Sequence, residues 1–197
     1  MNSPQSAVGN CLDVQSFINA QPLSRYQWRV VILCFLIVFL DGLDTAAMGF
    51  IAPALSQDWG IDRASLGPVM SAALIGMVFG ALGSGPLADR FGRKVVLVVA
   101  VLVFGGFSLA SAYSTNVDQL LVLRFLTGLG LGAGMPNATT LLSEYTPERH
   151  KSLLVTSMFC GFNLGMAGGG FSSAKLIPMF GWHSLLLIGG ILPLILT

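Results

Sequence analysis

Long apolar runs with few charges constrain this chain more than any other feature of its sequence. A helix that crosses the hydrocarbon core of a membrane needs about 20 mostly apolar residues. Five runs reach that length and a sixth begins near residue 183; the five cover residues 29–55, 66–88, 95–113, 119–142 and 152–173. These runs predict an all-α membrane protein that crosses the bilayer several times.

Composition excludes the main alternatives to a membrane protein. Only 10% of the 197 residues are charged and the mean hydropathy is +0.77, whereas soluble domains carry about 25% charged residues. One core cannot bury that much apolar surface, which excludes a water-soluble globular enzyme. A net charge of +1 argues against nucleic acid as a partner. The three cysteines and two histidines form no ligand cluster, so neither a metal nor another cofactor is expected.

The basic residues are distributed unevenly between the polar segments. Seven of the ten lie in the N-terminal tail or at its junction with the first run (Arg29) and in the second and fourth loops, two lie in the other loops, and Arg124 falls within an apolar run. Loops rich in Lys and Arg face the cytoplasm. We therefore expect residues 1–28 to form a cytoplasmic N-terminal tail and residues 29–197 to form the transmembrane bundle.

The sixth run is too short to cross a membrane. Residues 184–197 would form a helix of about 21 Å at 1.5 Å per residue, and the hydrocarbon core is about 30 Å thick. The chain ends inside this hydrophobic run. We expect an N-terminal fragment of a longer protein, with the sixth helix truncated.

Three ionisable residues fall inside the expected spans: Asp41, Asp44 and Arg124. Such residues are functional candidates that face a protein interior or a wet cavity. The three-residue spacing places Asp41 and Asp44 on one helix face, and two close carboxylates cannot both ionise cheaply, so one is expected to hold a proton. Arg124 stays cationic. It forms either a static ion pair that joins two helices or a fixed cation that attracts an anionic substrate.

Glycine pairs four residues apart occur in the second, fourth and fifth runs. This spacing lets helix backbones approach closely in a membrane. Tight packing is the expected role, and sliding of these helices is the alternative. The pairs are Gly76/Gly80, Gly128/Gly132, Gly130/Gly134, Gly161/Gly165 and Gly165/Gly169.

The segment between the second and third runs carries the most specific pattern in the chain. Residues Gly85 to Lys94 read Gly-Pro-Leu-Ala-Asp-Arg-Phe-Gly-Arg-Lys. Gly92 permits a tight turn, and Asp89 can stabilise the N-terminus of a facing helix. A loop that only sets orientation would not need this ordered pattern.

This stretch resembles the G-x-x-x-D-R-x-G-R-K signature of the major facilitator superfamily at every position. The segment from Arg124 to Gly130 resembles the fourth-helix motif of that superfamily, and Glu144 to Pro147 resembles the loop that follows it. The first-run sequence Asp41-Gly42-Leu43-Asp44 looks like the aspartate motif of its aromatic acid:proton symporter family. The resemblance covers residues 10–197, nearly the whole chain.

The resemblance implies a twelve-helix major facilitator fold, of which this chain would be the N-terminal six-helix bundle without the C-terminal six-helix half. It implies a transporter rather than an enzyme, in a bacterial inner membrane. That transporter would import an aromatic acid anion, such as 4-hydroxybenzoate or protocatechuate, with protons and by alternating access. Asp41, Asp44 and Arg124 would take part in proton coupling and substrate handling. The cytoplasmic gate would comprise Gly85, Asp89, Arg90, Gly92, Arg93, Lys94 and Glu144.

Three other functions remain as alternatives. Another facilitator-type carrier would take a sugar or a drug, but a neutral sugar needs hydrogen bonds more than a buried carboxylate pair. An intramembrane aspartyl protease takes its two aspartates from different helices, which fits the three-residue spacing of Asp41 and Asp44 poorly. The last alternative is a membrane fragment that has a sensory or structural role and does not transport a substrate.

Overall fold

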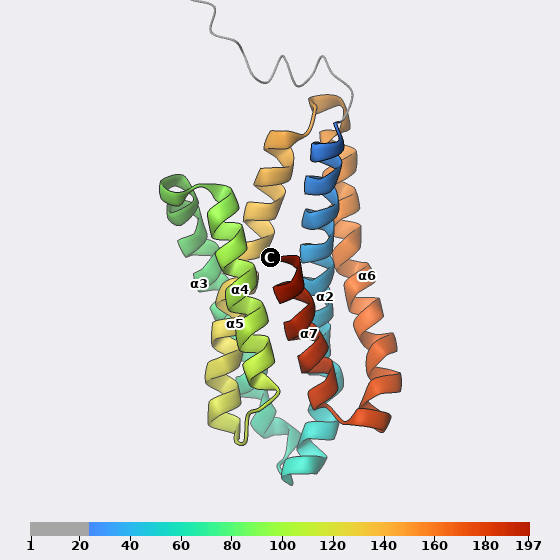
Figure 1. Cartoon of the computed structure of the whole chain (residues 1–197). Coiled ribbons are helices and arrows are strands. Elements are labelled where there is room, and N and C mark those ends of the chain that lie inside the picture. Colours follow the sequence, from blue (N-terminus) through green and yellow to red (C-terminus); the bar gives the residue numbers. More distant parts are fainter. Residues whose placement is uncertain (1–23) are drawn as a thin grey trace, which may run out of the picture.

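The computed structural model describes residues 24–197, and this part of the chain is almost entirely helical (Figure 1). The elements, labelled as in Figure 1, are α2 (Arg25–Trp59), η1 (Arg63–Leu66), α3 (Gly67–Phe91), α4 (Arg93–Ser111), α5 (Val117–Tyr145), α6 (Glu148–Phe180) and α7 (His183–Leu196). Five of these α-helices are long and apolar enough to cross a membrane, and α7 is a shorter apolar helix of 14 residues. The predicted all-α bundle of six helices with a short last helix is confirmed.

The first helix begins earlier than the sequence predicts. The Ser24 side chain accepts a hydrogen bond from the Gln27 backbone at 3.2 Å, and the Gln27 side chain accepts one from the Ser24 backbone at 2.7 Å. This reciprocal cap starts α2 at Arg25, four residues before the predicted span, and the boundary between tail and membrane bundle at residues 28 and 29 stays a prediction. Counting apolar residues finds the membrane span, whereas the cap sets the helix start outside it. Residues 1–23 of the predicted tail lie outside the described part of the chain.

The fifth span also extends beyond its predicted end at residue 173. Helix α6 continues through Pro178 to Phe180. It ends at Gly181, which has a φ of 75° and donates its N–H to the Ile177 carbonyl at 3.0 Å. The prediction was wrong because a proline in the last turn of a helix removes only one backbone donor there.

Glycines join the helices into two closely packed pairs, α3 with α5 and α2 with α6. A Cβ atom added at Gly76, Gly80, Gly128 or Gly132 would collide with a backbone carbonyl oxygen of the facing helix, and the same holds for Gly165. Glycine at these positions therefore lets backbone pack on backbone. The predicted close packing is confirmed there.

The pair Gly130/Gly134 behaves differently from the other predicted pairs. A Cβ at Gly130 would lie 2.6 Å from the Phe104 nitrogen on α4, so this glycine packs tightly. A Cβ at Gly134 would meet nothing within 4 Å. The prediction that both members of this pair mediate close packing is therefore wrong for Gly134.

The contacts between helices are related by an internal two-fold symmetry. Exchanging α2 with α5, α3 with α6 and α4 with α7 turns the packed pair α3/α5 into α2/α6, α4/α5 into α2/α7, and α3/α4 into α6/α7. The match extends to residues: Phe35, Phe39 and Gly42 of α2 make the same kinds of contact as Phe125, Leu129 and Gly132 of α5. Because each half has three successive spans, the second half is inverted with respect to the first. Figure 1 shows α7 in front of the bundle, between α4 and α2.

The apolar core is interrupted by polar groups midway along α2. One buried cluster includes Ile51 and continues toward the α2 C-terminus. A second cluster includes Val38 and continues toward the α2 N-terminus. Asp41 and Asp44 lie on α2 between these clusters, and each is only 3% exposed. The centre of the bundle is therefore the candidate functional site.

Candidate functional site

A buried ion pair crosses the centre of the bundle. The Arg124 guanidinium on α5 donates from Nη1 to Asp44 Oδ2 on α2 at 3.2 Å. The two side chains are 1% and 3% exposed. The sequence alone does not decide whether Asp44 and Arg124 meet, and the structure brings them together. Because the two residues belong to symmetry-related helices, the pair ties one three-helix repeat to the other.

Two serines of α4 complete this buried network. Ser108 Oγ donates to Asp44 Oδ1 at 2.6 Å and accepts from Arg124 Nη2 at 3.4 Å. Ser111 Oγ accepts from Arg124 Nε at 3.3 Å and donates to the Phe107 carbonyl at 2.7 Å. Within residues 24–197 every buried side-chain polar atom has a hydrogen-bond partner. The network therefore meets the requirement that charges inside a membrane protein are paired and hydrogen-bonded.

Sequence reasoning missed Ser108 and Ser111. Serine is common in membrane helices, where its hydroxyl can bond to the backbone of its own helix. The one signal was their three-residue spacing, which places both hydroxyls on the same face of α4. That spacing does not reveal which helix the face meets, so the contact with Asp44 could only come from the structure.

Helix α7 covers the network with a glycine. A Cβ added at Gly189 would lie 3.3 Å from Asp44 Oδ1 and 3.6 Å from Ser108 Oγ. The missing side chain lets the α7 backbone pack directly over the carboxylate. Four helices, α2, α4, α5 and α7, thus meet at Asp44.

Asp41 has different surroundings from Asp44. Its Oδ1 accepts a hydrogen bond from Thr45 Oγ1 on the same helix at 3.4 Å. It also lines a small cavity of about 10 Å³, whose other lining residues are all apolar or glycine: Ile37, Val101, Phe104, Gly130, Leu131 and Gly134. The two aspartates therefore share a helix face, but Arg124 pairs with Asp44.

The predicted gate residues lie where α3 passes into α4. Gly92 joins the two helices with a φ of 88°, as the tight turn requires, but Asp89 and Arg90 belong to the last turn of α3. Arg93 Nε lies 2.6 Å from Glu144 Oε1 on α5, with both side chains partly exposed.

The other predicted gate residues have no such partner. Among residues 24–197 the structure joins Asp89 and Lys94 to no ion pair. The Arg90 guanidinium lies over the neighbouring Phe91 ring at 5.4 Å, and a Cβ at Gly85 would meet nothing within 4 Å. The structure thus connects Arg93 with Glu144 and leaves the gate role of the set a prediction.

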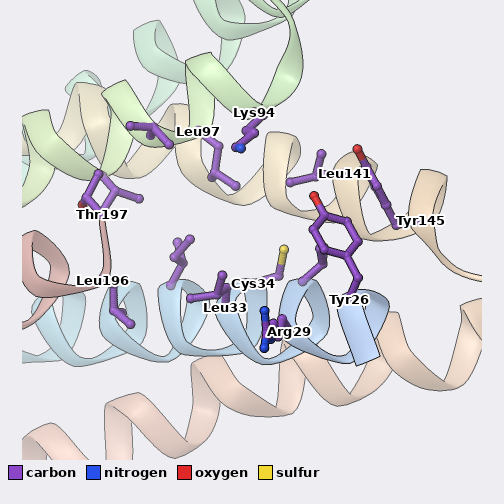
Figure 2. A pocket seen from close by; sticks show the side chains of 14 residues that line it. Tyr26, Arg29, Leu33, Cys34, Lys94, Leu97, Leu141, Tyr145, Leu196 and Thr197 are labelled. Carbon is purple, nitrogen blue, oxygen red and sulfur yellow. The ribbon is translucent and has the colours of Figure 1, made fainter. Parts of the chain in front are cut away.

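A larger cavity of about 290 Å³ opens at the end of the bundle where α2 begins (Figure 2). Its walls are mostly aliphatic, with Arg29 and Lys94 among its lining residues. Figure 2 shows Tyr26 rising from α2 toward Tyr145 of α5, and the two ring centroids lie 5.9 Å apart. The last two residues of the chain form part of its wall. Asp44 and Arg124 do not line this cavity.

Curated relatives match the chain along nearly its whole length. It is 90% identical over all 197 residues to the 4-hydroxybenzoate transporter PcaK of Pseudomonas putida, and these residues cover 44% of that protein. It is 73% identical to PcaK of Acinetobacter baylyi over 94% of this chain and 40% of that protein. It is 58% identical to a gallate transporter of Pseudomonas putida over 94% of this chain and 41% of that protein. The chain thus spans less than half the length of these relatives.

The fold is also found in a solved structure. The inward-open xylose transporter XylE from E. coli superposes with a TM-score of 0.75, over 87% of this chain and 47% of that chain. At 21% identity this likeness concerns the fold alone. The model of the Major Facilitator Superfamily matches residues 34–197, which include the buried network and the turn before α4. The chain is therefore a multi-pass membrane protein that belongs to the Major Facilitator Superfamily.

Proposed function

We propose that this sequence is the N-terminal half of a secondary active transporter that imports an aromatic carboxylate with protons by alternating access. The substrate is 4-hydroxybenzoate or protocatechuate. The observation that carries the proposal is the buried pair of Asp44 and Arg124, with a second carboxylate, Asp41, one turn away. The names of the relatives at 90% and 73% identity support the substrate class.

The ion pair supplies a physical route to coupling. When a proton binds Asp44, the negative charge that compensates Arg124 disappears. An unpaired guanidinium is costly in a water-excluded site, so an anionic carboxylate then binds more favourably. Proton and substrate thus favour each other's binding, as linkage requires. Loss of the proton restores the pair and favours release of the anion.

The proton stoichiometry decides whether import draws on the membrane potential. One proton neutralises one carboxylate, so a second proton would make entry electrogenic. Each net charge moved is worth about 2.3 kcal/mol per 100 mV. Asp41 is the second protonatable group available in the described bundle, because it lies buried beside the same network.

The turn before α4 acts as part of the cytoplasmic gate in this proposal. The unequal distribution of basic residues supports a cytoplasmic α2 N-terminus, and in this proposal the bundle lies in a bacterial inner membrane. Arg93 and Glu144 connect α4 to the end of α5 on that side. Asp89 is available for the N-terminus of a helix in the facing half.

In this proposal the large cavity near Arg29 is not the binding site of the substrate. Leu196 and Thr197 stand in its wall, and α7 ends there. In relatives more than twice as long as this chain, a helix that continued past this point would enter the same space. In this proposal the substrate binds near Arg124, the buried cation of the network.

The arrangement also favours transport over proteolysis. An aspartyl protease needs two carboxylates that share one proton at the reaction centre. Here the Asp44 carboxylate is held by Arg124 and Ser108, and Asp41 is bonded to Thr45. Neither carboxylate is presented to a substrate together with the other.

Uptake of labelled 4-hydroxybenzoate tests the proposal. The full-length protein carrying this sequence is expressed in a host without aromatic acid uptake, and an inward proton gradient is imposed with and without a protonophore. Asp41→Asn and Asp44→Asn are compared with Asp118→Asn, an exposed aspartate in the first turn of α5. We expect uptake to collapse with the protonophore and with the first two substitutions, and to persist with the third. Uptake by the wild type that ignores the protonophore would refute proton coupling, and uptake of xylose instead would favour a sugar carrier.

A further inference from the structure

Among residues 24–197, Ser108 is the one side chain that contacts both members of the ion pair through the same atom. Its Oγ is 2.6 Å from Asp44 Oδ1 and 3.4 Å from Arg124 Nη2, and the residue is fully buried. A hydroxyl has one proton to donate and lone pairs to accept with. Here the proton goes to the carboxylate, and the guanidinium donates to the oxygen.

In the described part of the chain, Ser108 is the residue of another helix that donates a hydrogen bond to Asp44 Oδ1. Gly189 of α7 packs against both the carboxylate oxygen and the Ser108 hydroxyl. The other carboxylate oxygen, Oδ2, is taken by Arg124. The serine hydroxyl is therefore a fixed partner of Asp44.

The charged groups around this hydroxyl are few. Asp44 contacts it from α2 and Arg124 contacts it from α5, and Asp41 lies one turn before Asp44 on α2. The other charged and titratable residues of the four helices lie near helix ends, except Cys34: they are Arg25, Tyr26, Arg29, Cys34, Asp58, Arg93, Lys94, Asp118, Glu144, Tyr145 and His183.

We propose that Ser108 is a positioning residue of the coupling site, which holds the ionised Asp44 against Arg124 and sets the pH at which the pair opens. This inference rests on the proposed function. A hydroxyl that donates to a carboxylate favours its charged form. When a proton from solution forms an O–H bond on Asp44, that group becomes a donor, and the serine hydroxyl can rotate to the carbonyl four residues earlier on α4. The same hydroxyl therefore serves both states of the pair.

The pH profile of uptake separates this role from a merely structural one. Ser108→Ala removes the donor, so Asp44 accepts a proton more readily, and the midpoint of uptake against pH should move upward by about one unit. Ser108→Thr keeps the hydroxyl and should restore the wild-type midpoint.

A matched control is available on another helix. Ser173 is a buried serine whose hydroxyl bonds only to the Gly170 carbonyl of its own helix. Ser173→Ala should change neither the abundance of the protein nor the midpoint. An unchanged midpoint in Ser108→Ala, at normal abundance, would overturn the positioning role.

A second measurement keeps the two proposals distinguishable. Infrared difference spectra of the purified full-length protein report the protonated carboxyl of Asp44, identified by its loss in Asp44→Asn. Ser108→Ala should raise the pH at which this signal appears, and a signal that titrates as in the wild type would refute the inference. This readout does not depend on transport, so a wild type that shows no proton-driven uptake refutes the proposed function alone. If Ser108→Ala reaches the membrane in low amounts, Ser108→Cys can replace it in this measurement. A thiol is a weaker hydrogen-bond donor than a hydroxyl, so Ser108→Cys should shift the infrared signal in the same direction.

Discussion

At the scale of single residues, the two aspartates of α2 have separate surroundings despite their shared helix face. Asp44 is held by a cation on α5 and a hydroxyl on α4. Asp41 faces a small apolar cavity and bonds within its own helix. A pattern of two acids three residues apart therefore does not make them equivalent, because a cation on one neighbouring helix reaches only one of them.

Neutralising one or both members of the ion pair should have opposite effects on abundance. Arg124→Gln leaves Asp44 buried without a cation, and removing one partner of a buried pair costs about 3–5 kcal/mol. We expect less protein in the membrane and no uptake. The double variant Arg124→Gln/Asp44→Asn should recover abundance without recovering proton-driven uptake, as measured by immunoblot and labelled substrate.

The control for this experiment is Arg63→Gln, at an exposed position in η1. It should change neither readout. Full abundance of Arg124→Gln alone would contradict the requirement for a compensating cation, and proton-driven uptake by the double variant would contradict the coupling role of the pair.

At the scale of helices, packing depends on glycines that place backbone against backbone. Gly80 meets the Leu129 carbonyl and Gly132 meets the Met77 carbonyl, so α3 and α5 are fixed by contacts in both directions. Any side chain at these positions must separate the two helices. The pair therefore behaves as one unit within the bundle.

Gly132→Val should separate α3 from α5 and prevent the bundle from forming. The reason is steric, since a Cβ there would overlap the Met77 backbone, and overpacking of this kind cannot relax without moving a helix. We expect a lower thermal midpoint and loss of the monodisperse peak in fluorescence-detected gel filtration. Gly83→Ala on α3, where a Cβ meets nothing within 4 Å, should match the wild type. Equal stability of the two variants would show that this contact does not hold the helices together.

Sequence reasoning reached the helices and the charged residues but not the partners that connect them. Hydropathy predicted five spans and a short sixth helix, and spacing predicted most of the close glycine contacts. The contact of Ser108 with Asp44 and the cover provided by Gly189 depend on which helices the inward faces of α4 and α7 meet, and the sequence of one helix does not specify its neighbours. The ends of α2 and α6 were misjudged because caps and last turns lie outside the apolar runs.

At the scale of the whole molecule, the bundle exposes extensive apolar surface. Large apolar side chains are exposed along α3 and α6, among them Leu74, Val78, Leu82, Leu164 and Phe171. These two helices are symmetry-related, and each covers one long side of the bundle. Surface of this kind requires lipid or another membrane segment against it, which agrees with a chain that spans less than half of its relatives.

The proposed orientation predicts which loops can be labelled from outside the cell. In a full-length protein whose natural cysteines are replaced, Thr115→Cys lies between α4 and α5 and Lys151→Cys lies at the start of α6. A membrane-impermeant thiol reagent should label the first in intact cells and the second only after permeabilisation. The reverse pattern would contradict a cytoplasmic N-terminus.

The two partners of the buried ion pair are 80 residues apart in the chain. A ribosome adds about 5–20 residues per second, so Arg124 emerges about 4–16 s after Asp44 during synthesis. Throughout that interval α2 carries an uncompensated carboxylate, at an insertion cost of about 2.5–3.5 kcal/mol at the helix centre. We therefore expect α2 to remain at the insertion machinery, or to enter lipid with Asp44 protonated, until α5 arrives. The pair that we propose to couple transport in the finished protein would thus also set the order in which its helices assemble.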